Sequence, residues 1–462
     1  MANRFSVSFI GLYIVLLGSF ASAREFIHDV SQLSVGQVCK IAAPKTVEEL
    51  QKIVQNTKHR IAIAGGRFSQ GGHIWYNGGI TIDMSNLNKI CHLDVEHKTI
   101  TVQTGATWQH IQKYIDPYNL SIRVMQSYND FSVGGSLSVN VHSRTINDGA
   151  LIETVQSIKI LLANGSIVTA SRSENYDLFT AAIGGYGAVG IIVEATLSLT
   201  DNEIIERQEV IMSLAQYGEY FTKMIRTNPD VVFHNADVHV NDFNKVSSVT
   251  WYKTTKPCTI LDRLQINKLF TLDYVAFQVA RYIPLIQKAR HIQTLKHGNK
   301  IVWRNYEMGT SVVTVEPTSR MISTTILQEY FVPCDKLQEF VAGMHAIVQK
   351  YNINMMNVSL RYIHRDTESI MAYAQAEESF ALVCYINMAN NSFGIQKAQN
   401  WTQELINCAI GCGGTYYLPY QPYATKDQFT KVYPEYKKLL EIKKRVDPNS
   451  RFMNSFLKKY IS

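Results

Sequence analysis

The hydrophobic positions of residues 45–200 follow two periods. Apolar or β-branched residues alternate or run together at 60–64, 80–84, 99–103, 157–162, 166–170 and 190–199, which predicts strands. Helical spacing predicts helices over 45–56, over 108–115 with Thr107 as N-cap, and over 176–183. The turn Ala163-Asn164-Gly165 predicts a hairpin between the fourth and fifth strands.

The pattern changes near 200–202, where we place a domain boundary. Longer strands are predicted beyond it, at 231–238, 246–252, 324–332, 357–363 and 381–387, with a helix at 336–350. This is typical of an antiparallel sheet covered by helices. We therefore predict an α+β fold with domains at 24–200 and 201–415 and a C-terminal segment at 416–462.

The N-terminus has a pattern of its own. Met1 to Arg4 carries one positive charge, residues 5–20 are almost wholly apolar, and Ala21-Ser22-Ala23 provides small residues for cleavage. This predicts a secretory signal peptide over 1–23 and an exported protein, periplasmic or secreted. Uncleaved, the same run could anchor the chain in a membrane.

Composition narrows the class of protein. The chain has 462 residues, of which 46% are hydrophobic and 18% are charged, and this composition is typical of an ordinary globular protein. Its seven cysteines include no CxxC pair, so we predict no metal site. Their odd number leaves at least one thiol unpaired.

The net charge of +7 is concentrated in two segments. Residues 281–304 hold six Lys or Arg and no acid, and residues 426–462 hold ten basic residues against four acidic ones. Two explanations stay open, solvated basic faces or peripheral contact with an anionic membrane or a phosphorylated lipid. No nucleic-acid-binding motif is present, and the export signal points away from nucleic acid.

One glycine motif is misleading. Residues 185–190 fit GxGxxG, which in isolation suggests a dinucleotide-binding Rossmann unit. That fingerprint requires a strand before the glycines and a helix after them, and the order predicted here is the reverse. The pattern therefore argues against a Rossmann domain.

A second glycine-rich turn follows a predicted strand. Residues 65–72 contain four glycines, which let backbone N–H groups converge on an anion. In isolation the turn could equally be a tight connection. A further small-residue loop at 132–142, together with the turn at 184–190, would contact an extended cofactor at three points.

In this order the motifs resemble a known family. AGGRFSQGG (64–72), SVGGSLSVNVH (132–142), LLANGSIVTAS (161–171) and residues 179–199 resemble the FAD domain of vanillyl-alcohol oxidase/p-cresol methylhydroxylase-type flavoproteins. Within that family the chain is similar to the sugar and aldonolactone oxidase branch, which includes decaprenylphosphoryl-ribose 2′-oxidase. Weaker likeness extends to 327–333, 358–362 and 423–452.

The resemblance implies a set of FAD-binding residues. The 65–72 turn would hold the pyrophosphate, the 132–142 loop would line the diphosphate and ring system, Ile191 or its neighbour Ile192 would meet adenine, and Tyr423 would reach the flavin. The implied residues are Gly65, Gly66, Arg67, Phe68, Ser69, Gln70, Gly71, Ser132, Gly134, Gly135, Asn140, His142, Ile191 and Tyr423.

Phe68 occupies the position at which several members of the family carry a histidine bonded to FAD. Phenylalanine has no nucleophile, so non-covalent FAD is predicted. His73 is the alternative candidate for linkage.

Catalytic residues are implied by the same resemblance. Lys426 resembles an active-site lysine and would serve as a neutral base if its pKa fell near the flavin; the alternative is a surface lysine. Arg361 would stabilise negative charge, although Ser359 stands where many members of the branch have a glutamate. Gln328, Tyr330 and Cys384 would face the substrate, and His142 would contact the cofactor and not act as a base.

The sequence thus predicts an FAD-dependent oxidoreductase that oxidises an alcohol of a sugar-like substrate by hydride transfer to FAD. The basic segments favour a phosphorylated or polyprenyl-phosphate sugar. The alternatives are an aldonolactone or alditol oxidase that produces hydrogen peroxide, and a flavin-binding protein without turnover.

Overall fold

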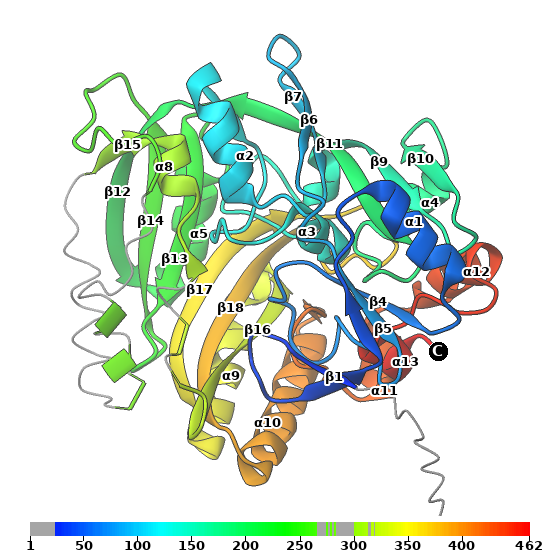
Figure 1. The fold of residues 1–462 in the computed structure, drawn as a ribbon. Coiled ribbons are helices and arrows are strands. Elements are labelled where there is room, and N and C mark those ends of the chain that lie inside the picture. The colour runs from blue at the N-terminus through cyan, green and yellow to red at the C-terminus, as the bar shows by residue number, and fades with distance from the viewer. Residues whose placement is uncertain are drawn as a thin grey trace, which may run out of the picture.

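The computed structural model describes residues 24–265, 274–275, 278–279, 281–282, 300–312, 316–317 and 319–462. Figure 1 shows two regions side by side, an N-terminal region in blue and cyan and a large curved sheet in green, yellow and orange. The predicted leader at 1–23 and residues 283–299 of the basic segment lie outside the described residues.

The N-terminal region contains two sheets and a hairpin. The smaller sheet is parallel, in the order β3 (Lys40–Ala42), β5 (Ile80–Asp83), β4 (Ile61–Ala64). The larger sheet is antiparallel, in the order β10 (Ile167–Ser171), β9 (Val155–Leu161), β11 (Ile191–Asp201), β7 (Thr99–Gln103), β6 (Ile90–Asp94), and β8 (Leu120–Ile122) also pairs with β11. The hairpin joins β1 (Glu25–His28) to β2 (Val35–Val38).

The second region is built on one eight-stranded antiparallel sheet. Its order is β15 (Ile301–Trp303), β12 (Ile204–Ser213), β14 (Lys245–Lys253), β13 (Val231–Val238), β17 (Asn354–His364), β18 (Glu378–Ala389), β16 (Ser323–Pro333), β19 (Thr415–Tyr416). Helices α9 (Leu337–Tyr351) and α10 (Ser392–Gly411) cover one face of it (Figure 1). The predicted α+β class, with an antiparallel sheet covered by helices, is confirmed.

Local sequence signals set the ends of several helices. Thr107 begins α2 (Trp108–Ile115) by accepting a hydrogen bond from the backbone N–H of His110, as its hydroxyl predicts. Ser132 begins α3 (Val133–Val139) in the same way. The remaining helices are α1 (Val47–Asn56), α4 (Tyr176–Ala182), α5 (Leu214–Tyr220), α8 (Arg304–Met308), α11 (Lys426–Val432), α12 (Tyr436–Val446) and α13 (Ser455–Tyr460).

The two regions are connected twice along the chain. Strand β11 ends at Asp201, and β12 begins at Ile204 in the other sheet. After β19, the C-terminal segment returns to the first region, where Phe452 forms a parallel bridge with Ile61. Residues from both regions and from this segment therefore meet near the glycine-rich turn.

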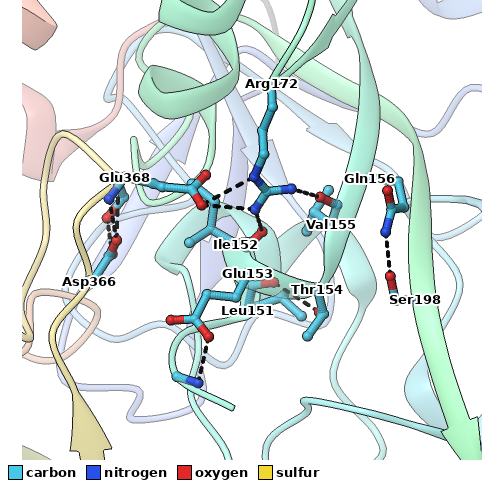
Figure 2. A network of polar contacts seen from close by, with 12 residues as sticks. Leu151, Ile152, Glu153, Thr154, Val155, Gln156, Arg172, Ser198, Asp366 and Glu368 are labelled. Atoms are coloured by element: carbon cyan, nitrogen blue, oxygen red, sulfur yellow. Dashed lines mark hydrogen bonds and ion pairs between the residues drawn. The ribbon is translucent and has the colours of Figure 1, made fainter.

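A polar clamp also joins the regions. We use this name for Asn140, Glu153 and Arg172 of the first region together with His364, Asp366 and Glu368 of the second. Figure 2 shows Arg172 bonded to Glu368 and to the carbonyls of Ile152 and Val155. The Asn140 amide donates to Asp366 at 2.9 Å, and Glu153 pairs with His364 at 2.7 Å.

Three observations concern other expectations from the sequence. None of the helices in the described ranges is long and apolar enough to cross a membrane. All seven cysteines are described, and each is a free thiol. Among the described residues, no cluster of His, Cys, Asp and Glu is arranged to hold a metal ion.

Candidate active site

A cavity of about 490 Å³ lies between the two regions. One wall comes from the turn after β4, from α3 and from residues 182–192. The opposite wall comes from the face of the large sheet that α9 and α10 leave free, with residues of β13, β16, β17 and β18. A volume of this size suits an organic ligand, and the walls differ in chemistry.

The glycine wall is backbone-rich because side chains would not fit there. A Cβ on Gly65 would lie 2.2 Å from the Ser132 hydroxyl oxygen, and a Cβ on Gly66 would lie 2.8 Å from the Phe68 ring. Arg67 adopts a φ of 63° and its side chain pairs with Asp83 at 2.6 Å. The turn thus lines the cavity with backbone and with Arg67, whose charge already has a carboxylate partner.

The turn between α4 and β11 completes this wall. A helix enters it and a strand leaves, as predicted, which is the reverse of a Rossmann unit. Gly187 has a φ of 76°, and Gly190 lies so close to β9 that a Cβ would sit 2.8 Å from the Leu161 carbonyl oxygen. Ile192 faces the cavity, whereas Ile191 packs in a hydrophobic core with Leu50.

The sheet wall carries charged and polar side chains. Arg361 of β17 donates to the Ser127 hydroxyl at 3.2 Å, and its Nε has no partner among the described residues. Burial lowers the pKa of Arg361, and the nearby Glu329 opposes that shift. That Nε is itself buried, so a ligand in the cavity that Arg361 lines would meet the terminal nitrogens of the guanidinium.

Glu329 of β16 is the centre of a buried hydrogen-bonded chain. Its Oε1 lies 2.5 Å from His142 Nε2, and its Oε2 accepts from the Tyr420 hydroxyl at 3.0 Å. Glu329 is only 2% exposed, yet all three residues line the cavity. Burial raises the pKa of Tyr420 well above its ordinary value, and the Glu329 charge adds to the shift, so Tyr420 stays a neutral hydroxyl.

Comparison with known proteins agrees with this division. The family described as "FAD binding domain" matches residues 40–171, and the family described as "D-arabinono-1,4-lactone oxidase" matches residues 195–460, which is more than half of the chain. The chain belongs to the D-arabinono-1,4-lactone oxidase family. It is an FAD-linked oxidoreductase that acts on CH–OH groups of sugar-derived substrates.

Two of three relatives align over most of the chain. L-gulonolactone oxidase of Bos taurus is 22% identical over 438 residues, covering 90% of this chain and 93% of its own. Mitochondrial L-galactono-1,4-lactone dehydrogenase of Arabidopsis thaliana is 24% identical and covers 69% of this chain and 50% of its own. Decaprenylphosphoryl-beta-D-ribose oxidase of Mycolicibacterium smegmatis is 31% identical but covers only 29% of this chain and 30% of its own.

The cavity of this D-arabinono-1,4-lactone oxidase family member fits its cofactor. FAD has a diphosphate, which needs closely approaching N–H groups, and a flat ring system, which needs small neighbours. The first half of the glycine turn brings backbone to the cavity for the diphosphate. The Gly134-Gly135 pair offers small neighbours for the rings, while its own N–H groups donate to the Thr104 carbonyl and the Ser132 hydroxyl. When bound, FAD supplies a hydride acceptor.

Ten of the predicted site residues line the cavity together. They come from both walls and from segments distant in sequence. They are Gly65, Gly66, Arg67, Phe68, Ser69, Ser132, Gly134, Gly135, His142 and Arg361.

Five residues predicted to bind FAD lie elsewhere. The N–H groups of Gln70 and Gly71 donate to Pro419 O and to Asp29, so the second half of the turn binds protein. Asn140 belongs to the polar clamp. Ile191 faces a core, and Tyr423 is replaced at the cavity by Tyr420, three residues earlier.

The structure does not bring Lys426 to the cavity. Thr425 caps α11 through a capping box with Gln428, which places Lys426 on the exposed outer side of the first turn. Its ammonium group donates to the Tyr460 carbonyl and lies 5.5 Å from the centre of the Tyr436 ring. This is the surface position that the sequence left open.

The three predicted substrate residues point to the opposite side of the sheet. Gln328, Tyr330 and Cys384 are buried on the helix-covered face, where the Tyr330 ring packs 5.5 Å from Phe340 of α9. Their neighbours Leu327, Glu329, Val383 and Tyr385 line the cavity instead. Successive side chains of a strand alternate between faces, so a shift of one residue exchanges the two sets.

Glu329 and Tyr420 are cavity residues that the sequence did not indicate. The prediction of Arg361 had identified the face of β17 that meets the cavity. Glu329 lies on the same face of the sheet, because it pairs with Val383 of β18 and Val383 pairs with Ser359 of β17. The pairing order of β17, β18 and β16 was needed to find this row.

Proposed function

We propose that this enzyme oxidises an uncharged polyhydroxylated substrate, a sugar lactone or an alditol, and that it holds FAD without a covalent bond. The observation that supports the substrate class is the charge of the sheet wall. Its carboxyl and guanidinium side chains in the described residues are Asp237, Glu329 and Arg361, and Glu316 lines the same cavity from the segment before β16.

A phosphorylated substrate would meet an unsuitable wall. On this side of the cavity three carboxyl groups stand against the one guanidinium of Arg361, while Arg67 lies on the opposite wall and pairs with Asp83. A phosphate on this side would be repelled by any of the three carboxyl groups that is ionised. Burial raises the pKa of Glu316 to about 7 even though Arg320 pairs with it. The wall is rich in acceptors for hydroxyl groups, as a polyol requires.

The remaining roles follow from the same wall. Arg361 would donate from its guanidinium to the oxygen of the reacting CH–OH group and stabilise negative charge that develops there. Asn357, which contacts Asp237 at 3.3 Å, and Ser359 would position the other hydroxyl groups.

The experiment is an anaerobic screen of the purified yellow protein against aldonolactones, alditols and phosphorylated sugars. We expect bleaching of the flavin absorbance with members of the first two classes. Bleaching by phosphorylated sugars alone would overturn the proposed substrate class, and no bleaching by any compound would favour a flavin-binding protein without turnover. A peroxide assay in air then tests whether O2 is the acceptor.

Attachment of FAD is tested separately. Phe68 packs against Phe131 with ring centres 4.3 Å apart, and the two ring nitrogens of His73 face the carbonyls of Gln70 and Leu418 at 2.8 and 3.0 Å. Neither side chain presents a free nucleophile. Acid precipitation should therefore leave the yellow colour in solution, and colour retained in the pellet would contradict non-covalent binding.

A further inference from the structure

We propose that Tyr420, Glu329 and His142 form the chain that removes the hydroxyl proton from the substrate, with Glu329 as the final acceptor. Removal of a hydride leaves a proton on the substrate oxygen, and a positioned acceptor is needed for it. This inference rests on the proposed oxidation of a CH–OH group but not on which sugar is the substrate.

The geometry gives each group one role. Tyr420 is the member with a hydroxyl, which can accept a proton and donate its own to Glu329 Oε2 at 3.0 Å. His142 holds the other carboxylate oxygen from the glycine side of the cavity at 2.5 Å. The chain therefore links the two walls.

The row across the sheet brings this chain beside Arg361. Glu329, Val383 and Ser359 are paired in sequence on β16, β18 and β17, so the Glu329 and Ser359 backbones are about 10 Å apart. Arg361 lies two residues beyond Ser359 on the same face, and the Glu329 charge acts on its pKa. Ser359 provides no carboxylate, and Glu329 provides one from two strands away.

The step balances. The C–H bond breaks as hydride passes to FAD, the O–H proton passes to the Tyr420 oxygen, and the proton of Tyr420 passes to Glu329. The C–O bond becomes a carbonyl. The carboxylic acid of Glu329 then returns its proton to water before the next turnover.

Other titratable groups surround Glu329 and must be considered in any pH test. Besides His142, those whose ionisation is coupled to its charge are Arg361, Tyr373, Cys384, Tyr417, Tyr420 and Tyr433. Burial raises the pKa of each of these tyrosines and of Cys384, so they stay neutral through the working range. These tyrosines and Cys384 therefore do not account for a loss of rate in acid.

The test is stopped-flow reduction of the flavin in the holoenzyme, with whichever alcohol bleaches it, across a range of pH. We expect Glu329→Gln to lower the limiting rate by about 10²-fold or more and to remove the loss of rate in acid, with FAD content unchanged. Tyr420→Phe should lower the same rate. Tyr460→Phe is the matched control, since the buried Tyr460 hydroxyl donates to the Ala424 carbonyl and is not among the groups coupled to Glu329.

Two results would overturn the proposal. One is a Glu329→Gln enzyme with the wild-type limiting rate. The other is a slower Glu329→Gln enzyme with the wild-type pH profile, which would make Glu329 a positioning group. Because the substrate is chosen by bleaching, a wrong substrate class would appear in the screen above and would leave this test intact.

Discussion

The two walls of the cavity differ in the groups that they offer to a ligand. The glycine wall binds with main-chain groups, and at Gly65 or Gly66 any added side chain would collide with Ser132 or Phe68. The sheet wall acts through side chains, each fixed by its strand register. Substitutions in the glycine wall should therefore weaken binding of FAD, whereas substitutions in the sheet wall should lower the rate at which the substrate reduces FAD.

Gly65 tests the glycine wall. In Gly65→Val the new side chain would force the turn away from α3, and we expect at least about a tenfold loss of FAD affinity, or about 1.4 kcal/mol. The ratio of flavin to protein absorbance after dialysis measures it. Gly218→Ala is the control, since a Cβ there has no neighbour within 4 Å. Full FAD occupancy in Gly65→Val would remove the distinction between the walls.

Arg361→Met should instead spare FAD and slow its reduction by substrate. Loss of one donor to developing negative charge lowers rates by about 10²–10³-fold. Lys426→Met is the matched comparison, because that lysine is exposed outside the cavity, and its reduction rate should stay within about twofold. A large loss of rate in Lys426→Met with normal rates in Arg361→Met would reverse the assignment.

Asn140 tests the clamp that holds the walls together. It donates to Asp366 and Ser369 and accepts from Ile152 N–H, with a φ of 50°. We expect Asn140→Ala to lower the free energy of unfolding by about 2–4 kcal/mol in urea titrations. Asn140→Gly tolerates the same backbone conformation, so its loss of stability reports the side-chain hydrogen bonds alone. Asn86→Ala is the control, because Asn86 is exposed and makes one hydrogen bond outside the clamp. Unchanged stability in both Asn140 variants would contradict the clamp.

The smallest effect is the pH dependence of the pair Glu153–His364. The hydrogen bond to Glu153 raises the pKa of His364, so its contribution is complete below the unfolded pKa of about 6.5 and is lost as pH rises through the folded value. The pKa of Glu153 is lowered: burial opposes that shift, and the bond to His364 outweighs burial with help from Gly149 and Arg123. Its contribution is present above the unfolded pKa of about 4.3 and is lost in stronger acid.

His364→Gln should therefore lower the melting temperature most near pH 5.5 and least near pH 8.5, by an amount equivalent to about 0.5–1 kcal/mol at most. Glu153→Gln should show the same trend. A deficit that grows towards pH 8.5 would mean that this pair does not join the walls as a charged pair.

Local patterns predicted eleven of the nineteen strands in the described residues, but among the helices only α1, α2, α4 and α9. The strand at 231–238 was predicted with its observed bounds, and the helix at 336–350 was displaced by one residue. Strand β12 was missed because Glu206, Arg207 and Glu209 interrupt its apolar alternation. Arg207 pairs with Glu209 within the strand, and Glu206 pairs with Lys256, which follows β14. The Lys256 partner cannot be read from the strand itself.

The sequence by itself determined the α+β class, the glycine turn that follows β4 and the arginine of β17. These features depend on local spacing and on residue types, such as the paired glycines of a tight turn, that few other local structures need. Only the tertiary structure decided which face of β16 and β18 meets the cavity, that Lys426 lies outside it, and that Glu329 joins His142 and Tyr420. A strand has two faces and a period of two, so its own sequence does not say which face a distant helix will cover. The pairing of strands far apart in the chain made that choice.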